Sequence, residues 1–134
     1  MGLMVKTMAV LAVVAAAPAL ALEPVAAPIL MDCAFGAECY ETEGCQETAF
    51  HAILVGDATG ESEVDLTALV ELRGDAGDVT MLGTLSNGRL SLTGGAGLGM
   101  HLLTLSAEGA VRYTVHYADG PTMVSYTGIC EPLP

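Results

Sequence analysis

Tryptophan is absent from this chain, and its four tyrosines and two phenylalanines are few for 134 residues. Basic residues are equally scarce, because four lysines and arginines stand against sixteen acidic residues and leave a formal net charge of −12. A chain this acidic has no electrostatic attraction for phosphate backbones or anionic lipids, which excludes nucleic-acid binding. The shortage of aromatic residues also argues against a platform on which sugars could stack.

Long hydrophobic runs are missing as well. The longest, Met8–Ala17, falls short of the roughly 20 residues of a membrane-spanning helix. It follows the positive charge of Lys6 and precedes the small-x-small sequence Ala19–Ala21, a layout typical of a secretory signal peptide over Met1–Ala21. No lipobox precedes Cys33. We therefore expect a soluble exported protein, periplasmic or secreted, with no membrane span.

Removal of the signal would take away the only lysine. Arg73, Arg89 and Arg112 would then face all sixteen acidic residues, twelve of which lie between Asp32 and Asp78. Acidity alone is sufficient for solubility. It would also suit a basic protein partner, through charge complementarity in the first half of the domain.

The four cysteines all follow the expected signal, and an oxidising compartment allows them to pair. Four cysteines permit three pairings, and sequence alone does not choose among them. Since Cys130 ends the last expected strand, its partner comes from the N-terminal cysteine loop. We predict Cys33–Cys130 with Cys39–Cys45, and Cys45–Cys130 is the alternative. No Cys-x-x-Cys motif indicates a redox pair or a zinc site.

The chain after Cys45 consists of short runs in which apolar and polar residues alternate. In Glu63–Arg73 every second residue from Val64 to Leu72 is apolar, and only Leu69 interrupts the polar face. Such alternation is typical of antiparallel strands with one buried face. We expect a β domain over residues 47–134, beginning with a strand at Thr48–Val55. Residues 22–46 should form an extended lead-in and a cysteine-rich loop.

Turn residues predict the strand pairing. Asn87-Gly88 favours a two-residue hairpin that places Leu85 opposite Leu90. A three-residue loop at Ala107–Gly109 places Leu103 opposite Tyr113, with Gly109 in a left-handed position. A turn at Asp119-Gly120 then brings Tyr113 opposite Tyr126. Four glycines within Gly94–Gly99 predict a loop or sharp corner in place of a regular strand.

These patterns predict an all-β protein, with no internal repeat and no helical periodicity. The expected architecture is a small antiparallel β-sandwich or a partly closed meander barrel of about seven strands, stapled by disulfides.

Two sets of residues are candidates for metal binding. Asp57, Glu61, Glu63 and Asp65 cluster around a glycine turn, and hard cations such as Ca²⁺ favour dense oxygen ligands, although a solvated hairpin end explains the same cluster. A copper or zinc site would draw on the three histidines, which are otherwise ordinary strand residues: His51, His101 and His116.

Nothing in the chain indicates an enzyme. A Gly-x-Ser-x-Gly turn is absent, and the glycine-rich Gly94–Gly99 lacks the lysine of a phosphate-binding loop. We expect no cofactor. The leading hypothesis is a non-enzymatic binding or envelope-accessory module, and the alternatives are an inhibitor of a basic enzyme and a metal-binding β-sandwich protein.

Two segments carry a resemblance to known proteins. Cys33–Cys45 and Tyr113–Cys130 resemble small exported proteins of alphaproteobacteria to which no function is assigned. Ser106–Tyr113 is loosely similar to a segment of periplasmic inhibitors of c-type lysozyme, whose lysine-bearing second segment has no counterpart here. The second resemblance implies a small barrel with a disulfide tying its ends and a basic enzyme as its target.

Overall fold

Nine β-strands make up the fold in the computed structural model, which describes residue 2 and residues 13–20, 22–120 and 122–134. Most of the expected signal peptide, including the core of its apolar run, lies outside these residues. The strands are β1 (Val25–Tyr40), β2 (Gly44–Glu47), β3 (His51–Ser62), β4 (Asp65–Gly74), β5 (Gly77–Ser86), β6 (Arg89–Ala96), β7 (Gly99–Leu105), β8 (Ala110–Tyr117) and β9 (Thr122–Pro132).

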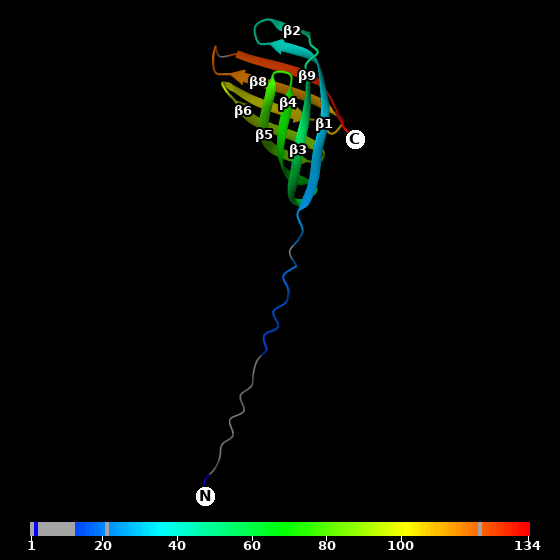
Figure 1. Cartoon of the computed structure of the whole chain (residues 1–134), viewed down its shortest axis with the longest axis vertical. Coiled ribbons are helices and arrows are strands. Elements are labelled where there is room, and N and C mark those ends of the chain that lie inside the picture. Colours follow the sequence, from blue (N-terminus) through cyan, green and yellow to red (C-terminus); the bar gives the residue numbers. More distant parts are fainter. Residues whose placement is uncertain (1, 3–12, 21, 121) are drawn as a thin grey trace.

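The sheet closes on itself, so the architecture is a barrel and not a sandwich. Strands β3 to β9 follow one another as antiparallel neighbours, and β1 pairs with β3 on one side and with β9 on the other. Eight strands form this closed barrel, and β2 is an extra strand that pairs only with β1. Figure 1 shows the β1–β2 hairpin at one end of the barrel and the N-terminal segment leaving at the opposite end.

Strand β1 corrects the expectation for residues 22–46. From Val25 onward the expected lead-in is a barrel strand, and the cysteine-rich segment is a β-hairpin rather than a loop. Residue 46 is therefore not a boundary of the fold. The alternation of apolar and polar residues is broken in β1 because its register shifts between Phe35 and Ala37. Residues after the shift therefore face the opposite side of the sheet from the side that the earlier pattern predicts.

The three hairpin registers are as predicted. Leu85 pairs with Leu90, Leu103 with Tyr113, and Tyr113 with Tyr126. Positive φ values of 50° at Asn87 and 75° at Gly88 show why the sequence Asn-Gly makes this turn. Gly109, at 99°, occupies the left-handed position expected for it.

The prediction of a loop at Gly94–Gly99 was wrong. Strand β6 continues through Gly94 and Gly95, which pair with His101 and Met100, and only residues 97 and 98 lie between the strands. A glycine is required at position 94 because a Cβ there would lie 2.4 Å from the carbonyl oxygen of Thr80. The glycines thus allow β5 and β6 to cross closely instead of ending the strand.

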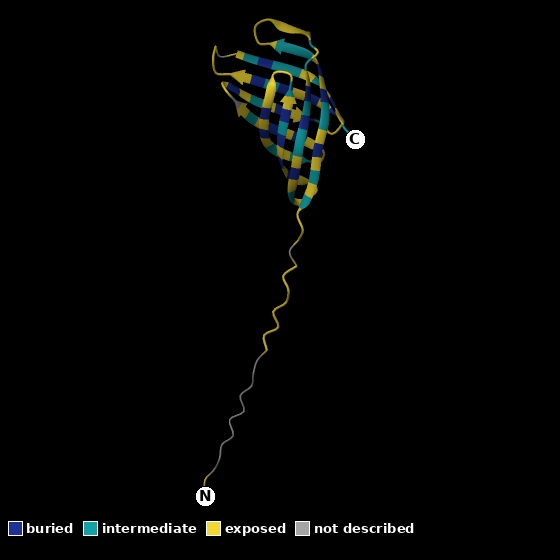
Figure 2. Cartoon of the chain, viewed as in Figure 1, coloured by how far each residue is buried: buried dark blue, intermediate teal, exposed yellow. Residues whose placement is uncertain are grey.

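The barrel interior is filled by the buried face of each strand, and Figure 2 shows buried and exposed residues alternating along the strands. On β4, Leu66, Ala68, Val70 and Leu72 are buried as expected, whereas Val64 is 56% exposed because it lies in the turn before β4. In barrels of this strand number, the interior is just wide enough for side chains to fill it or for one small ligand.

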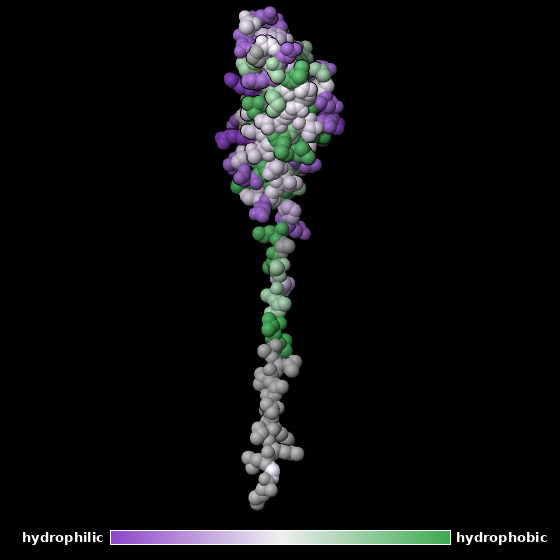
Figure 3. Space-filling model, turned by 90° about the vertical axis from the view of Figure 1, so that its left-hand side faces the viewer, coloured by the Kyte–Doolittle hydropathy of each residue, from purple (hydrophilic) through white to green (hydrophobic). Residues whose placement is uncertain are grey.

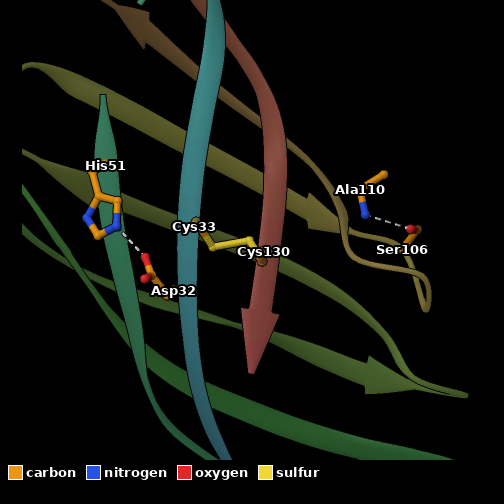
Figure 4. Close-up of a disulfide and its surroundings, with 6 residues drawn as sticks. All are labelled: Asp32, Cys33, His51, Ser106, Ala110 and Cys130. Atoms are coloured by element: carbon orange, nitrogen blue, oxygen red, sulfur yellow. Dashed lines mark hydrogen bonds and ion pairs between the residues drawn. A yellow bond between two sulfur atoms is a disulfide. The ribbon is translucent and has the colours of Figure 1, made fainter. Parts of the chain in front are cut away.

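Both disulfides join the predicted partners. Cys33–Cys130 connects β1 to β9, across the seam that closes the barrel (Figure 4). Cys39–Cys45 closes the β1–β2 hairpin. Next to the seam, the Ala110 amide donates to the Ser106 hydroxyl at 3.1 Å and fixes the β7–β8 turn. No helix in the described part of the chain is long and apolar enough to cross a membrane.

Candidate binding site at the aromatic end of the barrel

All six phenylalanines and tyrosines of the chain gather at the end of the barrel that carries the β1–β2 hairpin. We call this the aromatic end; its members are Phe35, Tyr40, Phe50, Tyr113, Tyr117 and Tyr126. They come from β1, β8, β9 and the segment that leads into β3. The opposite end, where the β3–β4, β5–β6 and β7–β8 turns lie, has no tyrosine or phenylalanine among its described residues.

Four of the rings pack into one cluster. Phe35 stacks on Phe50 with centroids 5.3 Å apart, and Phe50 approaches Tyr126 to 5.0 Å. Tyr113 lies 5.7 Å from Tyr126 and is stacked against it at an interplanar angle of 23°. Such separations are those of favourable aromatic pairs, which stabilise beyond the area that they bury.

A cavity of about 280 Å³ opens beside this cluster. Its wall contains the rings of Phe50, Tyr113, Tyr117 and Tyr126, the imidazole of His101, and aliphatic side chains of β4, β5 and β8. The β4–β5 turn forms the rim and contributes the exposed residue Asp78. The mouth of a β-barrel is a common place for a binding site, and here it is the position that concentrates the aromatic residues.

His101 and Tyr113 form a neutral pair in the cavity wall. Their rings stack with centroids 5.7 Å apart, and Nδ1 of His101 contacts the Tyr113 hydroxyl. Burial lowers the pKa of His101 and raises the pKa of Tyr113 to about 12. The phenol therefore donates to an unprotonated imidazole at neutral pH. This contact holds the two rings against each other in the cavity wall.

Glu38 lies over the same end as the cross-strand partner of Tyr126 and of Gln46. Its Oε1 accepts a hydrogen bond of 3.2 Å from Nε2 of Gln46 on β2. Hydrogen bonding to Glu38 raises the pKa of Tyr40, and burial together with Glu38 raises the pKa of Tyr126. The hairpin that Cys39–Cys45 closes thus holds a carboxylate between two phenols at the mouth.

Carboxylates surround the aromatic end. They are Glu38, Glu41, Glu43 and Glu47 on the β1–β2 hairpin, Asp75 and Asp78 at the β4–β5 turn, and Asp119 after β8. The nearby cation Arg73 is bound at Nε by Glu71 at 2.5 Å. Arg89 and Arg112 lie toward the opposite end, on the outer wall of β6 and β8. The potential at the aromatic mouth is consequently negative.

The carboxylates proposed for Ca²⁺ are not brought together. Glu61, Glu63 and Asp65 surround the β3–β4 turn, but Asp57 pairs with Leu69 in the middle of β3. Asp57 lies five positions before Ser62, the last residue of β3, a distance of roughly 16 Å along the strand. In the described residues, no group of three or more His, Cys, Asp or Glu side chains is placed to hold a metal ion.

The histidines do not converge either. His101 faces the interior next to Val115, and His116 is exposed. His51 on β3 instead pairs through Nε2 with Oδ1 of Asp32 on β1, on the outside of the barrel (Figure 4). This pair is half exposed and links β1 to β3 on the outer wall of the barrel.

Another exposed apolar surface lies on the barrel wall. Leu69 pairs with Leu82, and Thr93 separates Leu82 from Leu102 in the same cross-strand row. These leucines are about half exposed. The side of the barrel in Figure 3 shows hydrophobic groups of this kind between hydrophilic ones. None of the three leucines lines the aromatic cavity.

The number of aromatic residues in the sequence does not predict the aromatic end, because the end depends on where those residues lie in the barrel. The signal was available, since the predicted registers already set Tyr113 opposite Tyr126. The apolar–polar alternation does not predict β1, the strand that brings Phe35 and Glu38 to the same end of the barrel. Because aromatic residues are scarce in this chain, their presence at one end distinguishes that end from the rest of the barrel.

Comparisons of the chain with protein-family models, with curated proteins and with solved structures found no match.

Proposed function

We propose that this protein is an exported, non-enzymatic binding module and that its aromatic end recognises a basic protein partner. The observation that carries the proposal is the collection of all six phenylalanines and tyrosines at one end of the barrel, where four of their rings line an open cavity. A second opening of about 250 Å³ lies at the opposite end, but aliphatic side chains, turn residues and Cys130 line it, and none of its described lining residues is aromatic. Tyrosine is enriched at the centres of protein interfaces because it offers a large apolar face with a polar tip.

Charge determines the kind of partner. Carboxylates lie on the β1–β2 hairpin, at the β4–β5 turn and after β8, and Arg73, the arginine near the mouth, is held by Glu71. A basic surface would be attracted at long range and would approach the aromatic rings at short range. An acidic or phosphate-bearing partner would be repelled at the same place.

Export is supported by three features that agree with one another. The first 21 residues have the layout of a signal peptide. The structure pairs all four cysteines, and disulfides persist in oxidising compartments. The resemblance to small exported proteins of alphaproteobacteria points to the same compartment.

The test is capture of partners from a periplasmic extract by the immobilised exported protein. We expect a saturable partner with a basic isoelectric point. Its capture should be lost in the double variant Asp78→Asn/Tyr117→Leu, whose two side chains are exposed at the mouth. The matched control is Asp65→Asn, which removes one exposed carboxylate at the opposite end. Equal capture by the double variant and the original protein would refute the proposal.

A c-type lysozyme is a second candidate partner, favoured by the negative mouth and by the loose similarity of Ser106–Tyr113 to lysozyme inhibitors. That segment begins in the β7–β8 turn with Glu108, at the end opposite the aromatic cavity, and runs along β8 to Tyr113 in the cavity wall. A lysozyme inhibition assay therefore separates two surfaces. Inhibition that Glu108→Gln weakens and Asp78→Asn leaves intact would place the contact at the β7–β8 turn.

A further inference from the structure

We infer that the aromatic cavity receives one cationic side chain, a lysine or arginine of the partner protein, held against the tyrosine rings. This inference rests on the proposed function and specifies what enters the site.

The volume of the cavity fits a single side chain. The cavity measures about 280 Å³, just below the roughly 300–1,000 Å³ of sites that enclose drug-sized ligands. The remaining interior offers no continuation, because Leu54, Leu72 and Phe35 are buried with no more than 2% of their surface exposed. A long unbranched side chain suits such a short cavity.

The wall argues for a cation. Four aromatic rings line the cavity, and the electron-rich faces of such rings attract ammonium and guanidinium groups within about 6 Å. The phenols stay neutral at physiological pH, since burial raises the pKa of Tyr113 to about 12 and also raises that of Tyr126. Among the described residues that line the cavity, none is a lysine or arginine.

Carboxylates at the rim of the cavity supply the negative charge that would pair with the cation. Asp78 lines the cavity from the β4–β5 turn, and Glu38 lies across the mouth between Tyr40 and Tyr126. Asp78 is the register partner of Arg73, and both Glu71 and Asp78 raise the pKa of that guanidinium, so a cation entering the cavity would share Asp78 with Arg73. A long basic side chain would place its apolar stem against Leu72, Val79 and Val115 and its charged head between the rings and the carboxylates.

The experiment uses two probes that differ only in charge, N-acetyl-arginine amide and its neutral analogue N-acetyl-citrulline amide, at equal ionic strength. The readout is intrinsic tyrosine fluorescence. The protein has no tryptophan and its four tyrosines are all at the aromatic end, so the whole signal reports on this site. We expect a saturable change with arginine in the millimolar range. Citrulline should bind about two- to thirty-fold more weakly, the range that a cation–aromatic contact provides.

Two variants locate the binding. Tyr117→Leu and Asp78→Asn should each weaken the arginine probe, and Asp65→Asn should leave it unchanged. Tyr117 and Asp78 are exposed, so neither substitution disturbs the buried core, and circular dichroism checks that the fold persists.

Equal binding of both probes, or arginine binding that survives both mouth variants, would overturn the inference. If neither probe binds while a basic protein is still captured through the aromatic end, the inference fails and the proposed function stands. If the double variant captures as well as the original protein, the proposed function fails.

Discussion

Cys33 and Cys130 are direct register partners on β1 and β9, the two strands whose pairing closes the barrel. Both side chains are buried, with 0% and 3% of their surface exposed. The disulfide therefore joins two cysteines that are 97 residues apart in the chain. It lies where the first and last strands of the barrel meet. On the chain-entropy account, a crosslink of this span stabilises the folded state by about 4–5 kcal/mol.

Replacing both cysteines of this pair by alanine should lower the free energy of unfolding by about 4–5 kcal/mol, since the unfolded chain regains the freedom of a long loop. Urea denaturation under non-reducing conditions measures the loss. Cys39→Ala/Cys45→Ala is the control, because its crosslink spans only six residues and should contribute about 2 kcal/mol. An equal loss in the two double variants would show that loop length is not the cause.

Gly83 and Gly128 mark places where neighbouring strands approach too closely for a side chain. A Cβ at Gly83 would lie 1.7 Å from the Ser91 carbonyl oxygen, and one at Gly128 would lie 2.1 Å from that of Ala34. Alanine at either position should destabilise the barrel by about 1–3 kcal/mol or more, because backbone must move. Thermal unfolding measures this, with Gly36→Ala as the control, where a Cβ would meet nothing within 4 Å. Unchanged melting of Gly83→Ala would contradict the explanation.

The fold could be predicted from sequence wherever hairpins were short and alternation was unbroken. Leu85 opposite Leu90 followed from the positive φ that Asn87 and Gly88 tolerate, and each later turn fixed the next register. Closure could not be predicted in this way. It depends on β1, whose register shift near Gly36 breaks the alternation, and on pairing between the two ends of the chain.

Glycine was the other source of error. Glycine usually weakens a strand, so the sequence alone predicts that Gly94 interrupts β6. In the barrel it lies where a Cβ would meet the Thr80 carbonyl, a contact between strands that no local pattern contains. The aromatic end was missed for the same reason, since three-dimensional closure, and not sequence proximity, brings Phe35 to Tyr113.

Cys39–Cys45 should matter for binding more than for folding. It closes the β1–β2 hairpin, from which Gln46 donates to Glu38 at 3.2 Å and Glu38 reaches Tyr40 and Tyr126. Without the crosslink the hairpin loses the constraint that holds Glu38 over the mouth. We expect Cys39→Ser/Cys45→Ser to weaken the arginine probe several-fold in the fluorescence titration while the barrel remains folded at room temperature. Glu38→Gln should reproduce the effect on binding with both disulfides intact, and undiminished affinity in both variants would contradict this role.

Alkaline pH should destabilise the protein through its buried phenols. Folding raises the pKa of Tyr113 from 10.0 to about 12 by burial, so the folded state favours the neutral phenol. That contribution is fully present below pH 10, where the phenol is neutral in both states, and is lost as the pH rises from about 10 to 12. Urea midpoints measured across this window should fall in the original protein and fall less in Tyr113→Phe, which has no phenol to ionise.

Tyr126→Phe should act in the same direction, since the pKa of Tyr126 is also raised by burial. Gly36→Ala retains both phenols and should follow the original profile; an identical profile in all four proteins would show that these phenols do not govern alkaline unfolding.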